Sequence, residues 1–263
     1  FTNYRPISIL PIFSKFFEKI MYTRLEHHLK QYKILSPYQF GFRKNHSTSM
    51  AVIQFTEKVY DIIENRKFAI ATFLDLSKAF DLVNHSFLLQ KLTHYGIRGI
   101  ANDWINSYLE NRKQFVHYNN TQSSMLNITC GVPQGSILGP LLFILYINDM
   151  NEQTQDSTLH YTLYADDTKL SARVDRSLCA SPLVQHDITE FSAWTERWQL
   201  GLNENKCQAL RLGPSYRTNA NIDPQYSING YPIAVVSSVS DLGVLVSSDF
   251  TFKGHCASVA SRG

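Results

Sequence analysis

The chain has 263 residues, of which 44% are hydrophobic and 13% aromatic, with only 12 Gly and 9 Pro. This composition excludes a disordered or collagen-like chain and is sufficient for a sizeable core. Four cysteines lie far apart without a CxxC pair, so neither a zinc knuckle nor a disulfide framework is indicated, and a reducing, intracellular compartment is expected. The longest apolar run, at 137–147, is far shorter than the ~20 residues that cross a bilayer, so no membrane association is expected.

Charge is spread unevenly along the chain. The net charge is +3, but residues 1–50 contain eight Lys or Arg and two Glu, which gives +6 there and −3 in the remainder. A basic N-terminal part joined to a part with clustered aspartates indicates a surface for a polyanion beside a site for cations. On charge alone, a solvated helix face is an equally good interpretation.

The spacing of apolar residues predicts the elements. Helices are expected at about 14–32, 48–63, 87–95, 100–109, 140–147 and 183–198. Strands are expected at about 68–76, 114–118, 126–130, 159–164, 169–174 and 207–212. Ser14 is expected to cap the first helix, whose inward positions are Phe17, Ile20, Met21, Leu25, Leu29 and Tyr32. The pair Asn229-Gly230 is typical of a type I′ hairpin turn.

Two acidic segments place carboxylates where a strand ends or turns. Asp75 ends an apolar strand, with Asp81 six residues later, and Asp166 and Asp167 lie in a tight turn between two strands. A carboxylate in an apolar strand is costly unless compensated, and Mg²⁺ with its preference for oxygen ligands is a usual compensation. Two such segments side by side would hold the two metals of a phosphoryl transfer. Taken singly, an Asp-Asp pair is more often turn chemistry.

A Gly/Pro loop at 131–140 lies between these segments and precedes an apolar helix. Its glycines allow close backbone approach to a flat or charged ligand, and a helix N-terminus offers free N–H groups to phosphate. By itself, an ordinary loop and helix cap is the preferred interpretation.

The order of the blocks resembles the successive motifs of reverse transcriptases, most closely those of the non-LTR, LINE-type, jockey-like retrotransposons. Five blocks carry the resemblance: Tyr4-Arg5-Pro6-Ile7-Ser8, Gln39-Phe40-Gly41-Phe42-Arg43, Leu74-Asp75-Leu76-Ser77-Lys78-Ala79-Phe80-Asp81, Gly131-Val132-Pro133-Gln134-Gly135-Ser136 and Tyr164-Ala165-Asp166-Asp167. Two more resemble the blocks that close the palm: Trp198-Gln199-Leu200-Gly201-Leu202-Asn203-Glu204-Asn205-Lys206-Cys207 and Asp241-Leu242-Gly243-Val244.

The resemblance implies an α/β (α+β) right-hand polymerase fold with an antiparallel palm sheet. It implies basic partial fingers at 1–66, a palm at 67–246 with a finger insertion around 86–125, and the start of a mostly missing thumb at 247–263. A fingers strand ahead of Tyr4, which usually supplies a phosphate-binding lysine, is also expected to be missing. The implied activity is RNA-directed DNA synthesis on a primer, with an RNA template, a DNA primer or target, deoxynucleoside triphosphates and two Mg²⁺ ions, or Mn²⁺ in their place. A nuclear protein or a cytoplasmic ribonucleoprotein is expected, and the oligomeric state is not indicated.

The resemblance also implies roles for single residues. The catalytic carboxylates and metal ligands would be Asp75, Asp166 and Asp167, and Lys206 would protonate the leaving pyrophosphate. The nucleotide-binding residues would be Arg5, Phe80, Gln134 and Gly135, with Phe80 beneath the incoming sugar and Arg5 on the triphosphate. The template or primer contacts would be Arg43, Lys44, Leu242 and Gly243. Without the resemblance, Phe80 would be assigned to the core and Arg5 to the surface. Asp81 matches the family's second aspartate of its block, but it is best interpreted as holding the following turn.

Two other interpretations stay open. The chain would also suit a non-catalytic nucleic-acid-binding remnant of such an element, or another polymerase of the same fold, such as a group II intron maturase or telomerase. Primer extension on RNA and DNA templates would separate them.

Overall fold

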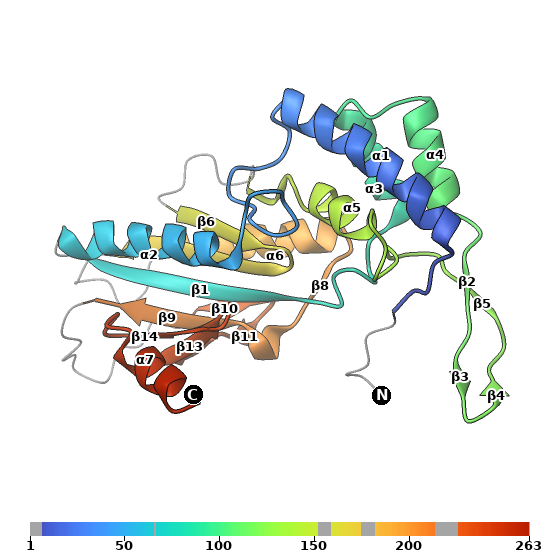
Figure 1. Cartoon of the computed structure of the whole chain (residues 1–263). Helices are drawn as coiled ribbons and strands as arrows, with labels where there is room; N and C mark the ends of the chain where they lie inside the picture. Colours follow the sequence, from blue (N-terminus) through green and yellow to red (C-terminus); the bar gives the residue numbers. More distant parts are fainter. Residues whose placement is uncertain (1–6, 66, 152–158, 175–181, 214–225, 263) are drawn as a thin grey trace. The chain divides into compact units, whose positions relative to one another are not determined.

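The structure is a computed structural model that describes residues 7–65, 67–151, 159–174, 182–213 and 226–262 (Figure 1). The chain forms two compact units. The helical unit comprises Phe1–Ser36, Lys78–Asp149 and Arg197–Gly201, and the sheet unit comprises Pro37–Ser77, Met150–Glu196 and Leu202–Gly263. This division does not test the predicted fingers, palm and thumb boundaries, which stay a prediction. No helix among the described residues is long and apolar enough to span a membrane.

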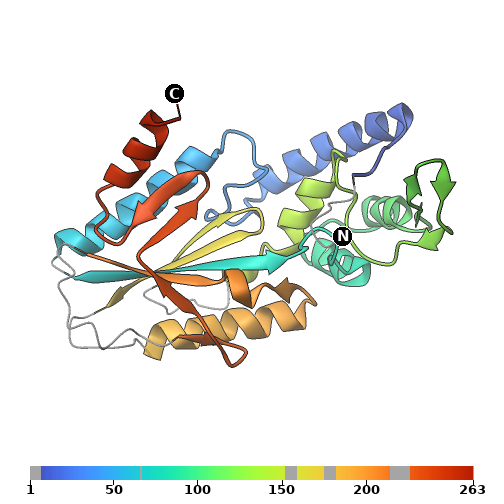
Figure 2. The same ribbon diagram turned by 90° about the horizontal axis from the view of Figure 1, so that it is seen from below.

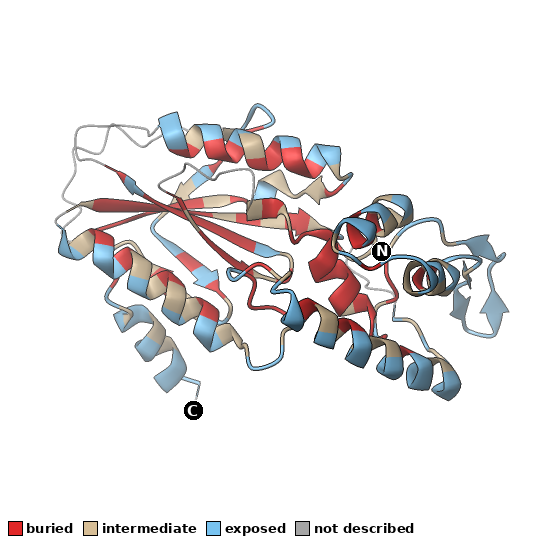
Figure 3. Ribbon diagram, turned by 90° about the horizontal axis from the view of Figure 1, so that it is seen from above, coloured by how far each residue is buried: buried red, intermediate tan, exposed pale blue. Residues whose placement is uncertain are grey.

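The helical unit contains four helices and a β-ribbon among its described residues. The helices are α1 (Ile12–Gln31), α3 (His85–His94), α4 (Ile100–Leu109) and α5 (Gly139–Tyr146). In the ribbon, β2 (Lys113–Gln114) pairs with β5 (Leu126–Asn127), and β3 (His117–Tyr118) pairs with β4 (Thr121–Gln122). Helix α5 is apolar around its whole circumference, and seven of its eight residues are buried (Figure 3).

The sheet unit is built on a sheet whose strands run in the order β12-β9-β1-β7-β6, and the short β8 also pairs with β1. These strands are β1 (Phe68–Ser77), β6 (Leu159–Tyr164), β7 (Asp167–Val174), β8 (Gly201–Leu202), β9 (Gln208–Leu212) and β12 (Ala234–Val236). The β1–β7, β6–β7 and β1–β9 pairs are antiparallel, as predicted, but β12 pairs with β9 in parallel. Helices α2 (Thr48–Glu64) and α6 (Pro182–Arg197) lie on opposite sides of this sheet (Figure 2).

Smaller elements complete the sheet unit. A 3₁₀ turn, η2 (Glu204–Lys206), precedes β9, and α7 (Lys253–Ala260) follows the last hairpin. The two hairpins are β10 (Ser227–Ile228) with β11 (Tyr231–Pro232), and β13 (Ser238–Asp241) with β14 (Val244–Ser247). Asn229 and Gly230 connect the first hairpin with φ angles of 52° and 80°. These angles confirm the predicted type I′ turn, which requires a positive φ at both central residues.

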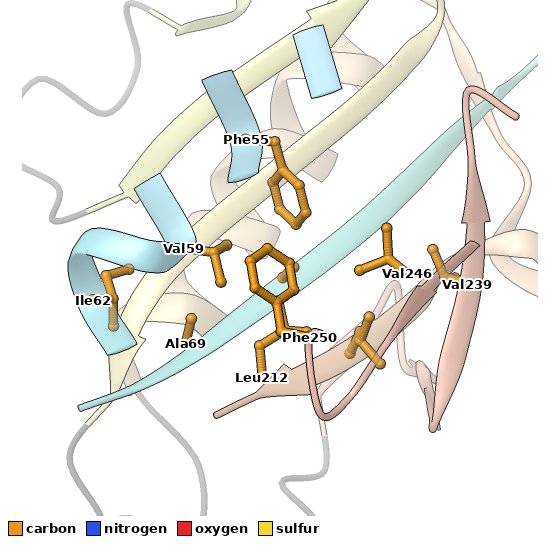
Figure 4. Close-up of a cluster of buried hydrophobic side chains, with 10 residues drawn as sticks. Phe55, Val59, Ile62, Ala69, Leu212, Val239, Val246 and Phe250 are labelled. Atoms are coloured by element: carbon orange, nitrogen blue, oxygen red, sulfur yellow. The ribbon is translucent and has the colours of Figure 1, made fainter. Parts of the chain in front are cut away.

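One face of the sheet is covered by α2 and the β13–β14 hairpin. Phe55, Val59 and Ile62 project from α2 toward the sheet, and the ring of Phe250 lies beside them (Figure 4). The rest of this cluster consists of Ala69, Ala71, Leu210, Leu212, Val239 and Val246. Burial of apolar side chains contributes about 1.5–3 kcal/mol for each large one, so this cluster anchors β1, the strand that carries Asp75.

The first helix differs from its prediction. It begins at Ile12, after Pro11, and the hydroxyl of Ser14 bonds the side chain of Glu18 inside the helix, so Ser14 is not the cap. Leu25 and Leu29 are buried as predicted, but the predicted inward positions Phe17, Ile20 and Tyr32 are exposed. Only the C-terminal half of the expected apolar face therefore packs inside this unit.

Two strand predictions also need correction. The strands expected at 114–118 and 126–130 are broken into four two-residue pieces, β2 to β5. The turn between β6 and β7 is shorter than the predicted four residues, because Asp167 and Thr168 already belong to β7. Only Ala165 and Asp166 connect the two strands.

Candidate active site

The three carboxylates predicted to be catalytic lie near one end of the sheet in the sheet unit. Asp75, near the end of β1, lies directly opposite Asp167, the first residue of β7. Asp166 occupies the two-residue turn between β6 and β7, beside Ala165, whose φ is 55°. Neighbouring antiparallel strands therefore deliver carboxylates to one end of the sheet.

The electrostatics of Asp167 reflect this crowding. The residue is exposed on one side, but protein atoms around its carboxyl group reduce its hydration, and this loss of hydration is the main cause that raises its pKa to about 6. The negative charges of Asp166, Asp241 and Asp75 raise the pKa further, and Lys169 opposes them. Several like charges close together are a common feature of functional sites.

Lys206 lies beside the first of these carboxylates. Its Nζ is 3.5 Å from Oδ2 of Asp75, and its side chain is mostly exposed. The backbone N–H of Asn203 donates to the carbonyl of Asp75 at 3.0 Å, which ties the segment before Lys206 to the end of β1. Both predicted residues are therefore neighbours, although an exposed ion pair of this kind contributes little stability.

A buried ion pair links strand β7 to the β13–β14 hairpin. Nζ of Lys169 lies 2.6 Å from Oδ2 of Asp241, and the two side chains are 1% and 4% exposed. Asp241 immediately precedes the turn residues Leu242 and Gly243, whose φ angles are 47° and 85°. Lys169 was not predicted, because an isolated lysine two residues after Asp167 carries no signal of a distant partner.

The turn that presents Asp166 is held by Gln39. The side chain of Gln39 is 2% exposed, and its Oε1 accepts hydrogen bonds from the backbone N–H groups of Ala165 (2.9 Å) and Gly41 (2.7 Å). The backbone N–H of Phe40 donates to the carbonyl of Leu163, so the segment runs alongside β6. Gln39 and Gly41 belong to a block that carries the resemblance, but neither residue had a predicted role.

The predicted template contacts near this block differ in their surroundings. Arg43 is half-buried and donates from Nη1 to the carbonyl of Gln39 at 2.9 Å, and burial lowers the pKa of its guanidinium. Lys44 is exposed. Arg43 therefore supports its own loop, whereas Lys44 carries its charge at the surface.

A second group of predicted residues lies in the helical unit. The side chain of Gln134 donates from Nε2 to Oδ1 of Asp81 at 2.8 Å. The backbone carbonyl of Gln134 accepts from the backbone N–H of Ser8 at 2.8 Å. The adjacent Gly135 has a φ of 93°, in the left-handed region that favours glycine, and is exposed. The side chain of Asp81 thus holds Gln134 across the fold, and its backbone N–H bonds the carbonyl of Lys78 in the turn that precedes it.

Phe80 is packed against α5. Its ring stacks on that of Phe143, with the ring centroids 4.3 Å apart and the planes 24° from parallel. The residue remains half-buried, so part of its ring is accessible. Phe80 is thus fixed by core packing and still presents a surface to solvent.

The loop before α5 does not have the free N–H groups expected at a helix start. The N–H groups of Ile137 and Leu138 both donate to Oε2 of Glu18, at 2.8 and 3.2 Å. The expectation of free phosphate-binding N–H groups is therefore wrong for these two positions. This contact could not be predicted, because Glu18 lies more than a hundred residues away on a helix with mostly basic charges.

The donor set at the strand ends fits a hard divalent cation. Among the described residues, the structure has no group of three or more His, Cys, Asp or Glu side chains arranged so that it could hold a metal ion. The fit rests instead on donor chemistry, because the charges of Asp75, Asp166 and Asp241 raise the pKa of Asp167, a repulsion that a bound cation would relieve. Arg5 lies outside the described residues.

Comparisons with known proteins identify the family and several relatives of the chain. A family model described as "Reverse transcriptase (RNA-dependent DNA polymerase)" matches residues 1–246. The chain is 31% identical over 270 aligned residues to a probable RNA-directed DNA polymerase from transposon X-element of Drosophila melanogaster, covering 99% of this chain and 28% of that protein. It is 30% identical over 262 residues to the RNA-directed DNA polymerase from mobile element jockey of the same species, covering 98% of this chain and 28% of that protein.

Solved structures show the same fold. The apo telomerase of Candida tropicalis matches with a TM-score of 0.60 at 12% identity, over 90% of this chain and 40% of that one. A telomerase structure from Candida albicans matches with a TM-score of 0.57 at 12% identity, over 89% of this chain and 38% of that one. The predicted right-hand polymerase fold is confirmed by this likeness.

Proposed function

Because the chain belongs to the reverse transcriptase (RNA-dependent DNA polymerase) family, we propose that it extends the 3′-hydroxyl of a primer with deoxynucleotides directed by an RNA template. Its similarity to the jockey and X-element polymerases favours a non-LTR retrotransposon as its source. The chain spans 28% of the length of these curated relatives, so the proposal concerns the polymerase reaction and no other activity of a longer protein.

The observation that carries the proposal is the pairing of Asp75 with Asp167, beside Asp166 in the adjoining turn. These three residues would hold Mg²⁺, or Mn²⁺ in its place. The bound metal would supply Lewis-acid stabilisation of the charge on the reacting phosphate oxygens. The carboxylates also keep this end of the sheet negative, which makes a cation a requirement for the approach of a triphosphate.

Lys206 is proposed to donate a proton to the leaving pyrophosphate. Its ammonium group is exposed and lies 3.5 Å from Asp75, so the carboxylate orients it while leaving its other protons available to a ligand. In the helical unit, Gln134 and Gly135 would lie along the incoming nucleotide, and the exposed part of Phe80 would face its sugar.

The remaining predicted contacts are with phosphates and with the nucleic acid. Arg5 is proposed to bind the triphosphate, and Lys44 to bind template phosphates through charge alone. Arg43 would contribute chiefly by shaping the loop that carries Lys44, because its guanidinium donates to the carbonyl of Gln39. The turn at Leu242 and Gly243 would contact the primer or template strand.

The test is extension of one labelled DNA primer annealed to RNA or to DNA of the same sequence, with Mg²⁺ and the four deoxynucleotides. Binding of each duplex is measured in parallel. We expect extension on the RNA template. Binding without extension on either template would indicate a nucleic-acid-binding remnant, and extension on DNA alone would contradict RNA-directed synthesis.

A further inference from the structure

Glu18 is a fully buried carboxylate in the middle of α1, with 0% of its side chain exposed. Both of its oxygens are used. Oε2 accepts from the backbone N–H groups of Ile137 (2.8 Å) and Leu138 (3.2 Å), and Oε1 accepts from the hydroxyl of Ser14 (3.2 Å). A buried charge is tolerated only when it is hydrogen-bonded. The two backbone N–H groups therefore compensate for the burial of the Glu18 carboxylate.

The two N–H groups belong to the entry into α5. The first N–H groups of a helix have no partner within the helix, and the positive end of the helix dipole lies there. A carboxylate is therefore the residue type best suited to this position. Ser136 completes the arrangement, because its hydroxyl accepts from the N–H of Gly139 and donates to the carbonyl of Pro133, both at 2.8 Å.

The predicted nucleotide-contacting residues are attached to this same entry. Gln134 lies three residues before Ile137, in the loop whose end Glu18 fixes. Phe143 lies on α5 and stacks on Phe80 at 4.3 Å. A shift of the α5 entry would therefore move the Gln134 loop and the support of the Phe80 ring together.

We propose that Glu18 is a positioning residue for the nucleotide site, acting through the N-terminus of α5 on Gln134 and Phe80. The inference rests on the proposed polymerase function. Glu18 does not touch the nucleotide. It fixes the backbone that presents the contacting groups, so it governs nucleotide affinity and sugar choice rather than template binding.

The experiment compares Glu18→Leu, which removes the acceptor, with Glu18→Gln, whose single amide oxygen can still accept both N–H groups without the charge. Glu26→Gln, at a partly exposed glutamate further along α1, is the matched control. Three quantities are measured: amide exchange of Ile137 and Leu138, equilibrium affinity and KM for a deoxynucleotide on a primed template, and the preference for deoxy- over ribonucleotides.

For Glu18→Leu we expect faster exchange at both amides and a KM increase of about tenfold or more, because small misplacements of contacting groups are costly. The preference for deoxynucleotides should fall, while affinity for the primed template stays unchanged. Glu18→Gln should lie between Glu18→Leu and the wild type, and Glu26→Gln should match the wild type.

The possible failures are distinguishable. Unchanged amide exchange in Glu18→Leu would overturn the anchoring, and faster exchange with unchanged nucleotide affinity and sugar preference would reduce Glu18 to a stabilising role. If the wild type binds the deoxynucleotide but does not extend the primer, the proposed function fails, and the change in nucleotide affinity still decides the inference. If the wild type neither binds nor extends, both fail.

Discussion

A methyl group added to Gly41 would lie 2.3 Å from the backbone nitrogen of Ala165, so the segment around Gly41 can approach the Asp166 turn only without a side chain. Gly41→Ala should push this turn away and break the hydrogen bonds that Gln39 makes to it. We expect a loss of about 1–3 kcal/mol of stability from overpacking. Nucleotide addition should fall by about 10² or more, because the carboxylate turn is displaced.

Gly254→Ala is the control for this prediction, since a methyl group there meets only Leu245 at 3.4 Å, an ordinary contact. It should leave primer extension unchanged. Thermal unfolding and single-nucleotide extension of both variants are the measurements. Wild-type extension rates in Gly41→Ala would show that the turn has room to adjust and that the close approach is not required.

The second prediction concerns the carboxylates on neighbouring strands. Asp75→Asn or Asp166→Asn should abolish nucleotide addition, because a neutral amide cannot balance the charge of a divalent cation. Binding of the primed template should remain nearly intact, since it depends on phosphate contacts elsewhere. Asp103→Asn, at an exposed site on α4, is the control and should be fully active. Substantial extension by either active-site variant would refute the assignment of these residues as metal ligands.

The third prediction concerns Phe80. Phe80→Val should lower the preference for deoxy- over ribonucleotides by about 10² or more, because removal of a bulky wall admits the extra hydroxyl. The loss of stacking on Phe143 should cost about 0.5–1.5 kcal/mol beyond the lost burial. The preference is measured by competing the two nucleotides in single additions, with Phe115→Val in the exposed ribbon as control. An unchanged preference with reduced stability would assign Phe80 to the core alone.

The fold was predictable from sequence where each element signals its own boundaries. The spacing of apolar residues placed a helix at 100–109, where α4 lies, and Asn229-Gly230 defined its own turn. The start of α1 was not predictable in this way. Ser14 has the residue type of a cap, but its hydroxyl bonds Glu18, whose own burial depends on a loop far along the chain.

The residues of the candidate site also differ in how far they could be predicted from sequence. Asp75, Asp166 and Asp167 were predicted as candidates because a carboxylate in an apolar strand is costly without compensation, and because the order of their blocks matches a known family. Gln39 and Lys169 were not, because an amide or a lysine gains its role only from partners 126 and 72 residues away. Such long-range pairs leave no local pattern, and only the folded chain reveals them.

The fourth prediction follows from the pKa of Asp167, which is raised from 3.8 to about 6 in the fold. The folded chain therefore binds this proton more tightly than the unfolded chain, and stability falls as pH rises from about 4 to 6. Asp167→Asn removes this effect. Without metal, the variant should unfold at a higher temperature than the wild type at pH 7, and the difference should shrink toward pH 4. The same difference at both pH values would contradict the raised pKa.

The fifth prediction concerns the buried pair of Lys169 and Asp241. Lys169→Met leaves the carboxylate buried without a partner, and breaking such a pair typically costs about 3–5 kcal/mol. The double variant Lys169→Met with Asp241→Asn should recover most of this loss, because it removes both buried charges and keeps similar volumes.

Protonation provides an independent check of the same pair. Burial raises the pKa of Asp241, and Lys169 opposes this rise. Without Lys169 the pKa should rise further, so the single variant should regain stability as pH falls and the carboxyl becomes neutral, whereas the double variant should show no such gain. The free energy of unfolding is measured by urea titration of the wild type, both single variants and the double variant at pH 7 and pH 5. A loss below about 1 kcal/mol in Lys169→Met, in the range of exposed ion pairs, would show that solvent reaches the pair and that it does not hold the hairpin to β7.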